Sequence, residues 1–500
     1  MSGSDHRSLG RRKRRIERRL ERRNWPDQTR PMFRRRRVRY EVSDRIRATV
    51  PGGIGAIHAL ACRLGLDRAI NGALSVFKRH LPYFESDHVL NIAYNVLAGG
   101  TRLEDIELLR NDEAYLDLIG AQRIPDPTTA GDFLRRPDEE DLECLMDAVN
   151  GIRRRVWRKE PKRFRQTAIV DVDGSIVSTL GEKKEGMGLS YKGIWGYHPL
   201  VITLANTGEP LYIVNRPGNV GSHTGCVRWL DKAIDLCERS YREVLLRGDT
   251  DFSLTGEFDR WSERGVRFVF GYDAHPNLVE RALDLPESAF EPLRRDRGRR
   301  GSRRDKRESV KERIVVERGF ENIKLCSEWV AEFEYRPVKS RRSYRMIVLR
   351  KDLSVEKGEE VLFPDVRFLF YITNDPDMNA EEVILHANAR CQQENLIEQL
   401  KNGVNALRVP VYDLVSNWAY MVIASLAWTL KAWFGLTLPE ERDRREIVAM
   451  EFKRFHNTVI RVPCQIITGA RSVRVRILGY TERVRLLLAS MRATAPLAAG

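Results

Sequence analysis

The spacing of apolar residues changes from a helical to a strand-like period near residue 167, and this change constrains the fold more than any other feature. Before it, apolar side chains recur every three or four positions across 52–158, which predicts five or six short helices. After it, short apolar runs bounded by turn residues predict strands, with helices expected at 226–240 and 254–264. The predicted strands cover 167–173, 199–205, 210–215, 244–249 and 266–271.

Three strands, a helix, a strand, a helix and a strand is the element order of an RNase H-like α/β fold with a mixed sheet. A β-rich insertion then interrupts the pattern, with a basic stretch at 294–313 and strands at 329–335 and 344–349. The core pattern resumes with a strand at 366–374 and a helix at 379–401. The predicted organisation is a basic disordered arm (1–45), a helical DNA-binding or dimerisation domain (46–160), the first part of the catalytic core (161–273), the insertion (274–365), the second part of the core (366–440) and a C-terminal region (441–500).

Positive charge is concentrated at the N-terminus. The formal net charge of the chain is +16, and residues 1–50 hold 18 Lys and Arg against 6 Asp and Glu. A segment this basic and this poor in apolar residues cannot build a core of its own, and it is typical of a chain that binds a polyanion. We therefore expect DNA as the partner, with Arg34, Arg35, Arg36 and Arg37 among the contacts.

Three carboxylates fall where a nucleic-acid enzyme with two metal ions needs them. Asp173 ends the first strand, Asp249 ends the fourth, and Glu394 lies on the helix that follows the insertion. The first and fourth strands of an RNase H-like sheet are neighbours, so the two aspartates are expected side by side. Clustered carboxylates favour a divalent cation, and hard oxygen ligands favour Mg²⁺ or Mn²⁺. Asp171 is an alternative to Asp173 and Asp251 to Asp249.

The helix sequence Arg390-Cys-Gln-Gln-Glu394-Asn-Leu-Ile-Glu-Gln-Leu-Lys401 resembles the Arg-x3-Glu-x6-Lys signature of DDE-type transposases of bacterial insertion sequences, in the group-1 DDE domain branch. Leu246-Arg-Gly-Asp249-Thr-Asp-Phe252 is similar to the family's motif around its second aspartate. Family-like segments also occur at 124–129, 197–200, 216–219 and 371–374. A tyrosine of the signature is missing, because its position holds Ala387.

This resemblance implies a Mg²⁺-dependent transposase that binds terminal inverted repeats, cleaves at the transposon ends and joins the 3′-hydroxyl to target DNA. It implies that Asp173, Asp249 and Glu394 are catalytic metal ligands and that Arg390 and Lys401 hold DNA phosphates, with Arg247 as a further contact. Joining two ends implies a dimer or a larger assembly. The rival interpretation is a transposase remnant that binds DNA without cleaving it, as a repressor or architectural protein. A hairpin route and other cleavage routes both stay open.

The remaining features indicate a cytoplasmic, nucleoid-associated protein. The seven cysteines form no Cys-x-x-Cys pair, so we expect reduced thiols. The longest apolar run, 414–430, is slightly short for a membrane span and contains polar residues, which favours a buried helix. No apolar segment follows the basic N-terminus, which excludes a secretory signal there.

Overall fold

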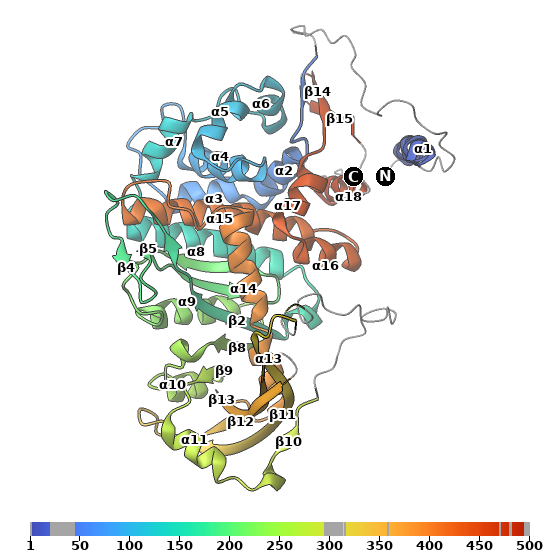
Figure 1. Cartoon of the computed structure of the whole chain (residues 1–500). Helices are drawn as coiled ribbons and strands as arrows, with labels where there is room; N and C mark the ends of the chain where they lie inside the picture. The colour runs from blue at the N-terminus through green and yellow to red at the C-terminus, as the bar shows by residue number, and fades with distance from the viewer. Residues whose placement is uncertain are drawn as a thin grey trace.

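The computed structural model describes residues 3–20, 46–294, 314, 317–357, 360–469, 472–479 and 483–494. Its N-terminal part is helical, as predicted, and lies at the top of Figure 1. The elements up to residue 165 are α1 (Gly3–Leu20), β1 (Ala48–Thr49), α2 (Ile54–Leu64), α3 (Leu66–Ala73), α4 (Glu85–Leu97), η1 (Leu103–Asp105), α5 (Ile106–Arg110), α6 (Glu113–Ile119), α7 (Pro127–Leu134), α8 (Glu139–Trp157) and η2 (Lys162–Arg165).

Aspartates fix where several of these helices begin. Asp138 accepts a hydrogen bond from the Asp141 N–H at 2.9 Å and begins α8. Asp126 accepts one from the Thr129 N–H at 2.9 Å and begins α7, with Pro127 in the first helical position. Thr128 and Thr129 lie inside α7, because an aspartate followed by proline is the stronger start signal.

A nine-stranded mixed sheet forms the centre of the molecule, in the order β10-β11-β12-β13-β9-β8-β2-β6-β7. Its RNase H-like part is β7-β6-β2-β8-β9, in which β2 pairs antiparallel with β6 and parallel with β8, and β8 pairs parallel with β9. The predicted order of elements is therefore confirmed. These strands and the helices between them are β2 (Thr167–Gly174), β6 (Leu200–Leu204), β7 (Glu209–Val214), α9 (Cys226–Glu238), β8 (Glu243–Gly248), η3 (Thr250–Phe252), α10 (Phe258–Glu263) and β9 (Arg267–Tyr272).

A short three-stranded sheet interrupts the core between β2 and β6. It consists of β3 (Val177–Ser178), β4 (Gly188–Leu189) and β5 (Trp195–Tyr197), with β5 in the middle. The sequence pattern did not predict it, since its strands are two or three residues long and rich in glycine.

The insertion extends the core sheet. The strand that ends it, β13, pairs antiparallel with β9 and carries β12, β11 and β10 outward from the core edge (Figure 1, lower half). Both long strands run several residues beyond the predicted ones, and β13 continues across the expected boundary at 366. The elements are α11 (Pro276–Leu283), η4 (Glu287–Ala289), β10 (Glu291–Pro292), β11 (Glu321–Tyr335), β12 (Tyr344–Lys357) and β13 (Glu360–Thr373).

The predicted helix at 379–401 is broken. It forms α13 (Ala380–Asn388), α14 (Cys391–Glu398) and a π-helical turn, η5 (Gln399–Gly403). The remaining elements are α15 (Leu414–Leu436), α16 (Glu441–Ala449), α17 (Phe452–Phe455), η6 (His456–Ile460), β14 (Cys464–Gly469), β15 (Ser472–Ile477) and α18 (Val484–Thr494).

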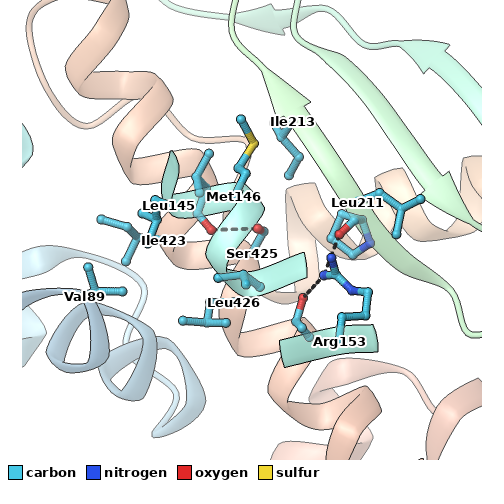
Figure 2. A pocket seen from close by; sticks show the side chains of 13 residues that line it. Val89, Leu145, Met146, Arg153, Leu211, Ile213, Ile423, Ser425 and Leu426 are labelled. Atoms are coloured by element: carbon cyan, nitrogen blue, oxygen red, sulfur yellow. Dashed lines mark hydrogen bonds between the residues drawn. The ribbon is translucent and has the colours of Figure 1, made fainter. Parts of the chain in front are cut away.

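The central helix α15 is buried along its length, as predicted. It is long and apolar enough to cross a membrane, but it packs against α4, α8, α16 and β7 inside the protein. A buried ion pair joins these elements: Glu209 of β7 accepts a hydrogen bond from Arg153 of α8 at 3.0 Å and from Trp433 of α15 at 2.8 Å. Figure 2 shows Arg153 at one end of a mostly apolar cavity of about 30 Å³ between α4, α8 and α15. That volume suits about one water molecule, so the cavity is a packing defect and no ligand site.

The N-terminal helices and the C-terminal region pack as one unit. Strand β1 pairs with β14, and α18 contacts α2. The first part of the predicted disordered arm forms helix α1, where Arg12 donates hydrogen bonds to the Ile477 and Leu478 carbonyls at 2.8 and 3.0 Å. An i,i+4 pair, Lys13–Glu17, supports that helix, in a segment where the sequence analysis expected a disordered arm. Arg34, Arg35, Arg36 and Arg37 lie outside the described residues.

Candidate active site

Two carboxylates meet where the carboxyl ends of β2 and β8 lie side by side. Asp173 is near the end of β2, and Asp249 directly follows β8, where its side chain accepts a hydrogen bond from the Asp251 N–H at 3.1 Å. Because β2 and β8 are parallel neighbours, both side chains emerge at the same edge of the sheet. The structure therefore brings together the two aspartates that the sequence singled out.

Arg390 bridges these aspartates. Its Nη2 lies 3.2 Å from Asp173 Oδ2 and 3.3 Å from Asp249 Oδ2. It stands in the break between α13 and α14, and its Nε is buried without a hydrogen-bond partner. A helix that ran straight through 390 would place this side chain elsewhere, so the break positions the guanidinium.

Burial makes this pair of carboxylates costly to ionise. It raises the pKa of Asp173 to about 6, an effect that Arg390 opposes and the charge of Asp249 reinforces. Burial also raises the pKa of Asp249, again against Arg390. Two desolvated carboxylates beside one guanidinium leave one negative charge uncompensated, which is an environment that favours an additional cation.

Asp171 is not part of this cluster. It is buried and accepts hydrogen bonds from Arg247 Nε at 2.6 Å and from Nη2 at 2.8 Å. The third nitrogen of Arg247 donates to the His386 carbonyl at 2.9 Å. The arrangement is a closed ion pair between β2, β8 and α13.

Arg247, which the sequence analysis expected to contact DNA, is buried within the protein. Its side chain is 2% exposed and its hydrogen-bonding groups are engaged within the protein. The family-like motif around Asp249 includes Arg247. The sequence alone did not show that Arg247 forms a buried ion pair with Asp171. Asp251, the alternative to Asp249, is exposed and makes no contact with Arg390 among the described interactions.

Glu394 lies in the first turn of α14, one turn after Arg390, and is exposed. Within the described parts of the chain, no group of three His, Cys, Asp or Glu side chains is close enough to hold a metal ion. The structure therefore unites Asp173 with Asp249 and leaves Glu394 outside this pair, on the adjoining helix α14. The oxygen donors of the aspartate pair fit a hard divalent cation.

Lys401 reaches the site through the π-helical turn. The turn inserts an extra residue into the helical repeat, and the Lys401 Nζ donates to the Ile176 carbonyl at 3.3 Å. Burial lowers the pKa of Lys401, an effect that the charges of Glu398 and Asp173 oppose. Arg390 and Lys401 thus both place positive charge near Asp173.

A groove of about 610 Å³ begins beside Lys401. It runs between the core and the loop before α5, and its lining includes Ile176, Arg102 and Arg408. The sequence analysis missed the last two. Their contribution depends on the contact between 101–104 and 401–410, which are far apart in sequence, and no local signal could have found it.

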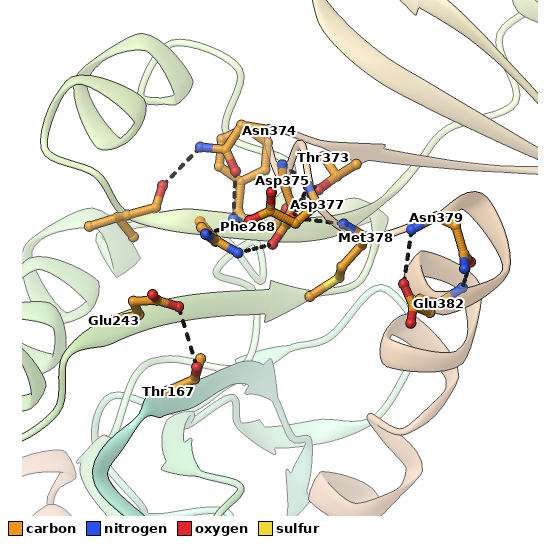
Figure 3. A network of polar contacts seen from close by, with 12 residues as sticks. Thr167, Glu243, Phe268, Thr373, Asn374, Asp375, Asp377, Met378, Asn379 and Glu382 are labelled. Atoms are coloured by element: carbon orange, nitrogen blue, oxygen red, sulfur yellow. Dashed lines mark hydrogen bonds and ion pairs between the residues drawn. The ribbon is translucent and has the colours of Figure 1, made fainter. Parts of the chain in front are cut away.

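The segment 371–374, singled out as family-like, anchors the return from the insertion (Figure 3). Thr373 Oγ1 donates to the Phe268 carbonyl at 2.7 Å, and Asn374 Oδ1 accepts from the Phe268 N–H at 2.8 Å. Asp375 then pairs with Arg267 at 3.0 Å. These contacts fix the start of the segment that leads into α13 and to Arg390.

Comparisons with known proteins add to this geometry. A family model described as "Transposase DDE domain group 1" matches residues 31–496. Among solved structures, the chain is similar to the piggyBac transposase in its synaptic complex with hairpin DNA, at 10% identity and a TM-score of 0.35, over 91% of this chain and 87% of that one. No curated protein matches the chain.

Proposed function

The chain belongs to the transposase DDE domain group 1 family, whose members are DDE endonucleases and strand transferases of DNA transposition, and we propose that Asp173, Asp249 and Glu394 are its catalytic carboxylates. The observation that carries the proposal is the pair of partly buried aspartates that share Arg390 at the ends of two parallel strands. Family members act with divalent metal ions, and we propose Mg²⁺, with Mn²⁺ as a substitute.

The aspartate pair would hold the metal, with Glu394 completing the set from α14. Such ions activate a water molecule or a 3′-hydroxyl and stabilise the leaving oxygen of a phosphodiester. Arg390 and Lys401 carry positive charge on either side of Asp173, where they would orient the phosphate under attack. Orientation by these two side chains and charge compensation by Arg390 are the contributions of the chain itself.

The proposed substrates are the terminal inverted repeats of the element and its target DNA. The net charge of +16 and its concentration in the first 50 residues support contact with the phosphate backbone. The groove beside Lys401, with Arg102 and Arg408 in its lining, offers a continuation of this surface towards the helical part. Joining two ends to one target requires two copies, so we propose a dimer or a larger assembly on DNA.

The test is strand cleavage of a labelled duplex carrying the terminal repeat of the element, in Mg²⁺, for wild type and Glu394→Gln. The variant keeps the shape of the side chain and removes its charge, so it should bind the duplex normally and cleave it at least about 100-fold more slowly. Glu398→Gln is the matched control, because Glu398 lies one turn further along α14, is also exposed and contacts Asn402. The control should cleave like wild type.

Two results would overturn the assignment. Equal cleavage by wild type and Glu394→Gln would remove Glu394 from the metal site. Binding without cleavage by wild type, unchanged by chelation of the metal, would instead support the DNA-binding remnant.

A further inference from the structure

The β3-β5-β4 sheet follows β2, the strand that carries Asp173. Its strands β4 and β5 form a β-hairpin, whose tip consists of residues 189–195. Its tip is an ordered turn: the Gly193 N–H donates to the Ser190 carbonyl at 2.9 Å, and the Ser190 N–H donates to the Ile194 carbonyl at 2.9 Å. Gly193 has a φ of 70°, which a residue with a side chain rarely adopts. The tip therefore has a defined shape.

This tip exposes large apolar side chains. Tyr191 is 77% exposed and Trp195 is 54% exposed, and Leu189 and Ile194 beside them are also exposed. The single charged residue of 187–195 is Lys192, whose Nζ lies 5.3 Å from the centre of the Tyr191 ring. An ordered turn that displays two aromatic rings and two aliphatic side chains together is a binding surface.

The base of the hairpin is rigid. A side chain at Gly196 would lie 2.0 Å from the Val177 carbonyl, and one at Gly218 would lie 2.3 Å from the Gly188 carbonyl, so three backbone segments pack without room for side chains. Lys184 Nζ donates to the Val409 carbonyl at 2.6 Å and ties the hairpin to the loop before α15. The exposed rings are thus held in place before any partner binds, which lowers the entropy lost on binding.

The base of the hairpin adjoins the proposed active site. Lys401 Nζ donates to the carbonyl of Ile176, three residues after Asp173, at 3.3 Å. Ile176 and Val177, at the base of the hairpin, also line the groove that begins beside Lys401. A DNA end with a phosphate at Asp173 and Asp249 would therefore lie close to the hairpin.

We propose, building on the proposed function, that the hairpin tip (residues 189–195) separates the bases of the DNA end next to the phosphate that is cleaved. Tyr191 and Trp195 provide aromatic faces for unpaired bases, and Lys192 provides a contact for the neighbouring phosphate. Stacking of a base on an aromatic side chain offsets the cost of unpairing that base. A tip with aromatic rings, one lysine and no acidic residue suits a nucleic acid better than a basic or neutral protein surface.

The test uses the full chain, the double variant Tyr191→Ala/Trp195→Ala and two labelled duplexes carrying the terminal repeat of the element. One duplex is fully paired, and the other has mismatched bases at the cleavage site. The variant should cleave the paired duplex roughly 10- to 100-fold more slowly than wild type, as expected from the loss of one or two stacked bases. It should cleave the mismatched duplex within about threefold of wild type, because that end is already open.

A binding readout separates this proposal from the proposed function. With 2-aminopurine placed at the cleavage site, wild type should raise the fluorescence of the bound duplex in Ca²⁺ or EDTA, and the double variant should not. Phe320→Ala is the control, because Phe320 is an equally exposed aromatic residue outside the hairpin. It should match wild type in both assays.

Each contrary result has a distinct meaning. If the double variant cleaves the paired duplex at the wild-type rate, or is slowed equally on both duplexes, the hairpin does not separate bases. If wild type opens the end in the fluorescence assay but cleaves neither duplex, the proposed chemistry fails while the role of the hairpin stands. If wild type neither opens nor binds the end, both proposals fall.

Discussion

Lys431 lies in the middle of α15 with its ammonium group buried. Its Nζ donates to the Val448 carbonyl at 2.8 Å and lies 3.7 Å from the centre of the Trp428 ring. Burial lowers the pKa of Lys431 to about 7, from 10.5. Below pH 7 the folded protein must bury the charge. Between pH 7 and 10.5 the unfolded chain holds a proton that the folded chain has lost, so the contribution of Lys431 to stability improves as the pH rises.

Lys431→Met should therefore stabilise the protein at pH 6 by roughly 4 kcal/mol, since a shift from 10.5 to about 7 corresponds to about 5 kcal/mol and the lost hydrogen bond offsets about 1 kcal/mol. The advantage should shrink steadily towards pH 10. Urea unfolding of wild type and variant across this range measures it. Lys453→Met, at an exposed position, should show no such dependence. A difference that is the same at pH 6 and pH 10 would show that Lys431 stays charged.

At the same scale, the active-site residues show where local sequence is informative. The acidic ends of two strands were recognisable because a buried strand that stops at an aspartate has a distinct pattern, and the structure places Asp173 and Asp249 together. The choice between Asp171 and Asp173 was open, because both follow the same alternation. The structure decides between them, because Arg247 of the neighbouring strand β8 forms an ion pair with Asp171.

Among the elements, the segment from β13 to α13 connects the insertion with the active site. Asn374 donates to the Ser262 hydroxyl at 2.9 Å and to the Val266 carbonyl at 2.8 Å, in addition to its contact with Phe268. Asn379 then caps α13 through the Glu382 N–H at 2.8 Å. One side chain thus holds β13, β9 and the end of α10 in register before the chain enters the helices with Arg390 and Glu394.

Asn374→Ala should lower the free energy of unfolding by about 2–4 kcal/mol, because it removes three hydrogen bonds and leaves backbone groups of 266 and 268 without that partner. Urea unfolding measures this loss, and hydrogen exchange should show faster opening of 380–398. Asn402→Ala is the control, since Asn402 is exposed and bonds to Glu398 on the surface. Equal stability of the two variants would contradict the anchoring role of Asn374.

The sequence pattern did not predict the helix breaks and strand lengths, for a related reason. The stretch 379–401 has a continuous helical pattern, yet the structure breaks it at 389–390 and adds a π-helical turn at 399–403. The break turns Arg390 towards Asp173, and the π-helical turn brings Lys401 to the Ile176 carbonyl. Such contacts come from another part of the chain, so the local period cannot reveal them.

For the whole molecule, the distribution of charge predicts how the protein meets DNA. Most of the net charge lies in the first 50 residues, while strand β1 and the core begin at residue 48. Deletion of residues 1–45 should therefore leave the core folded and weaken binding of the terminal-repeat duplex. It should also reduce the dependence of the binding constant on salt, because fewer counterions are released.

Fluorescence anisotropy at several salt concentrations measures both quantities, and circular dichroism with a thermal melt checks the fold. Because Arg12 of α1 contacts β15, a small loss of thermal stability is expected. An unchanged salt dependence would show that the arm makes no phosphate contacts in the complex.

The sequence by itself determined the order of strands and helices, the buried nature of α15, the family and the two aspartates at strand ends. These follow from apolar periodicity and from motifs a few residues long, which are local properties. The tertiary structure decided that Arg390 bridges the aspartates, that Arg247 is buried against Asp171, that the insertion extends the core sheet, and that an apolar hairpin stands beside the site. Each of these depends on contacts between segments far apart in the chain, because burial and charge pairing are set by neighbours in space.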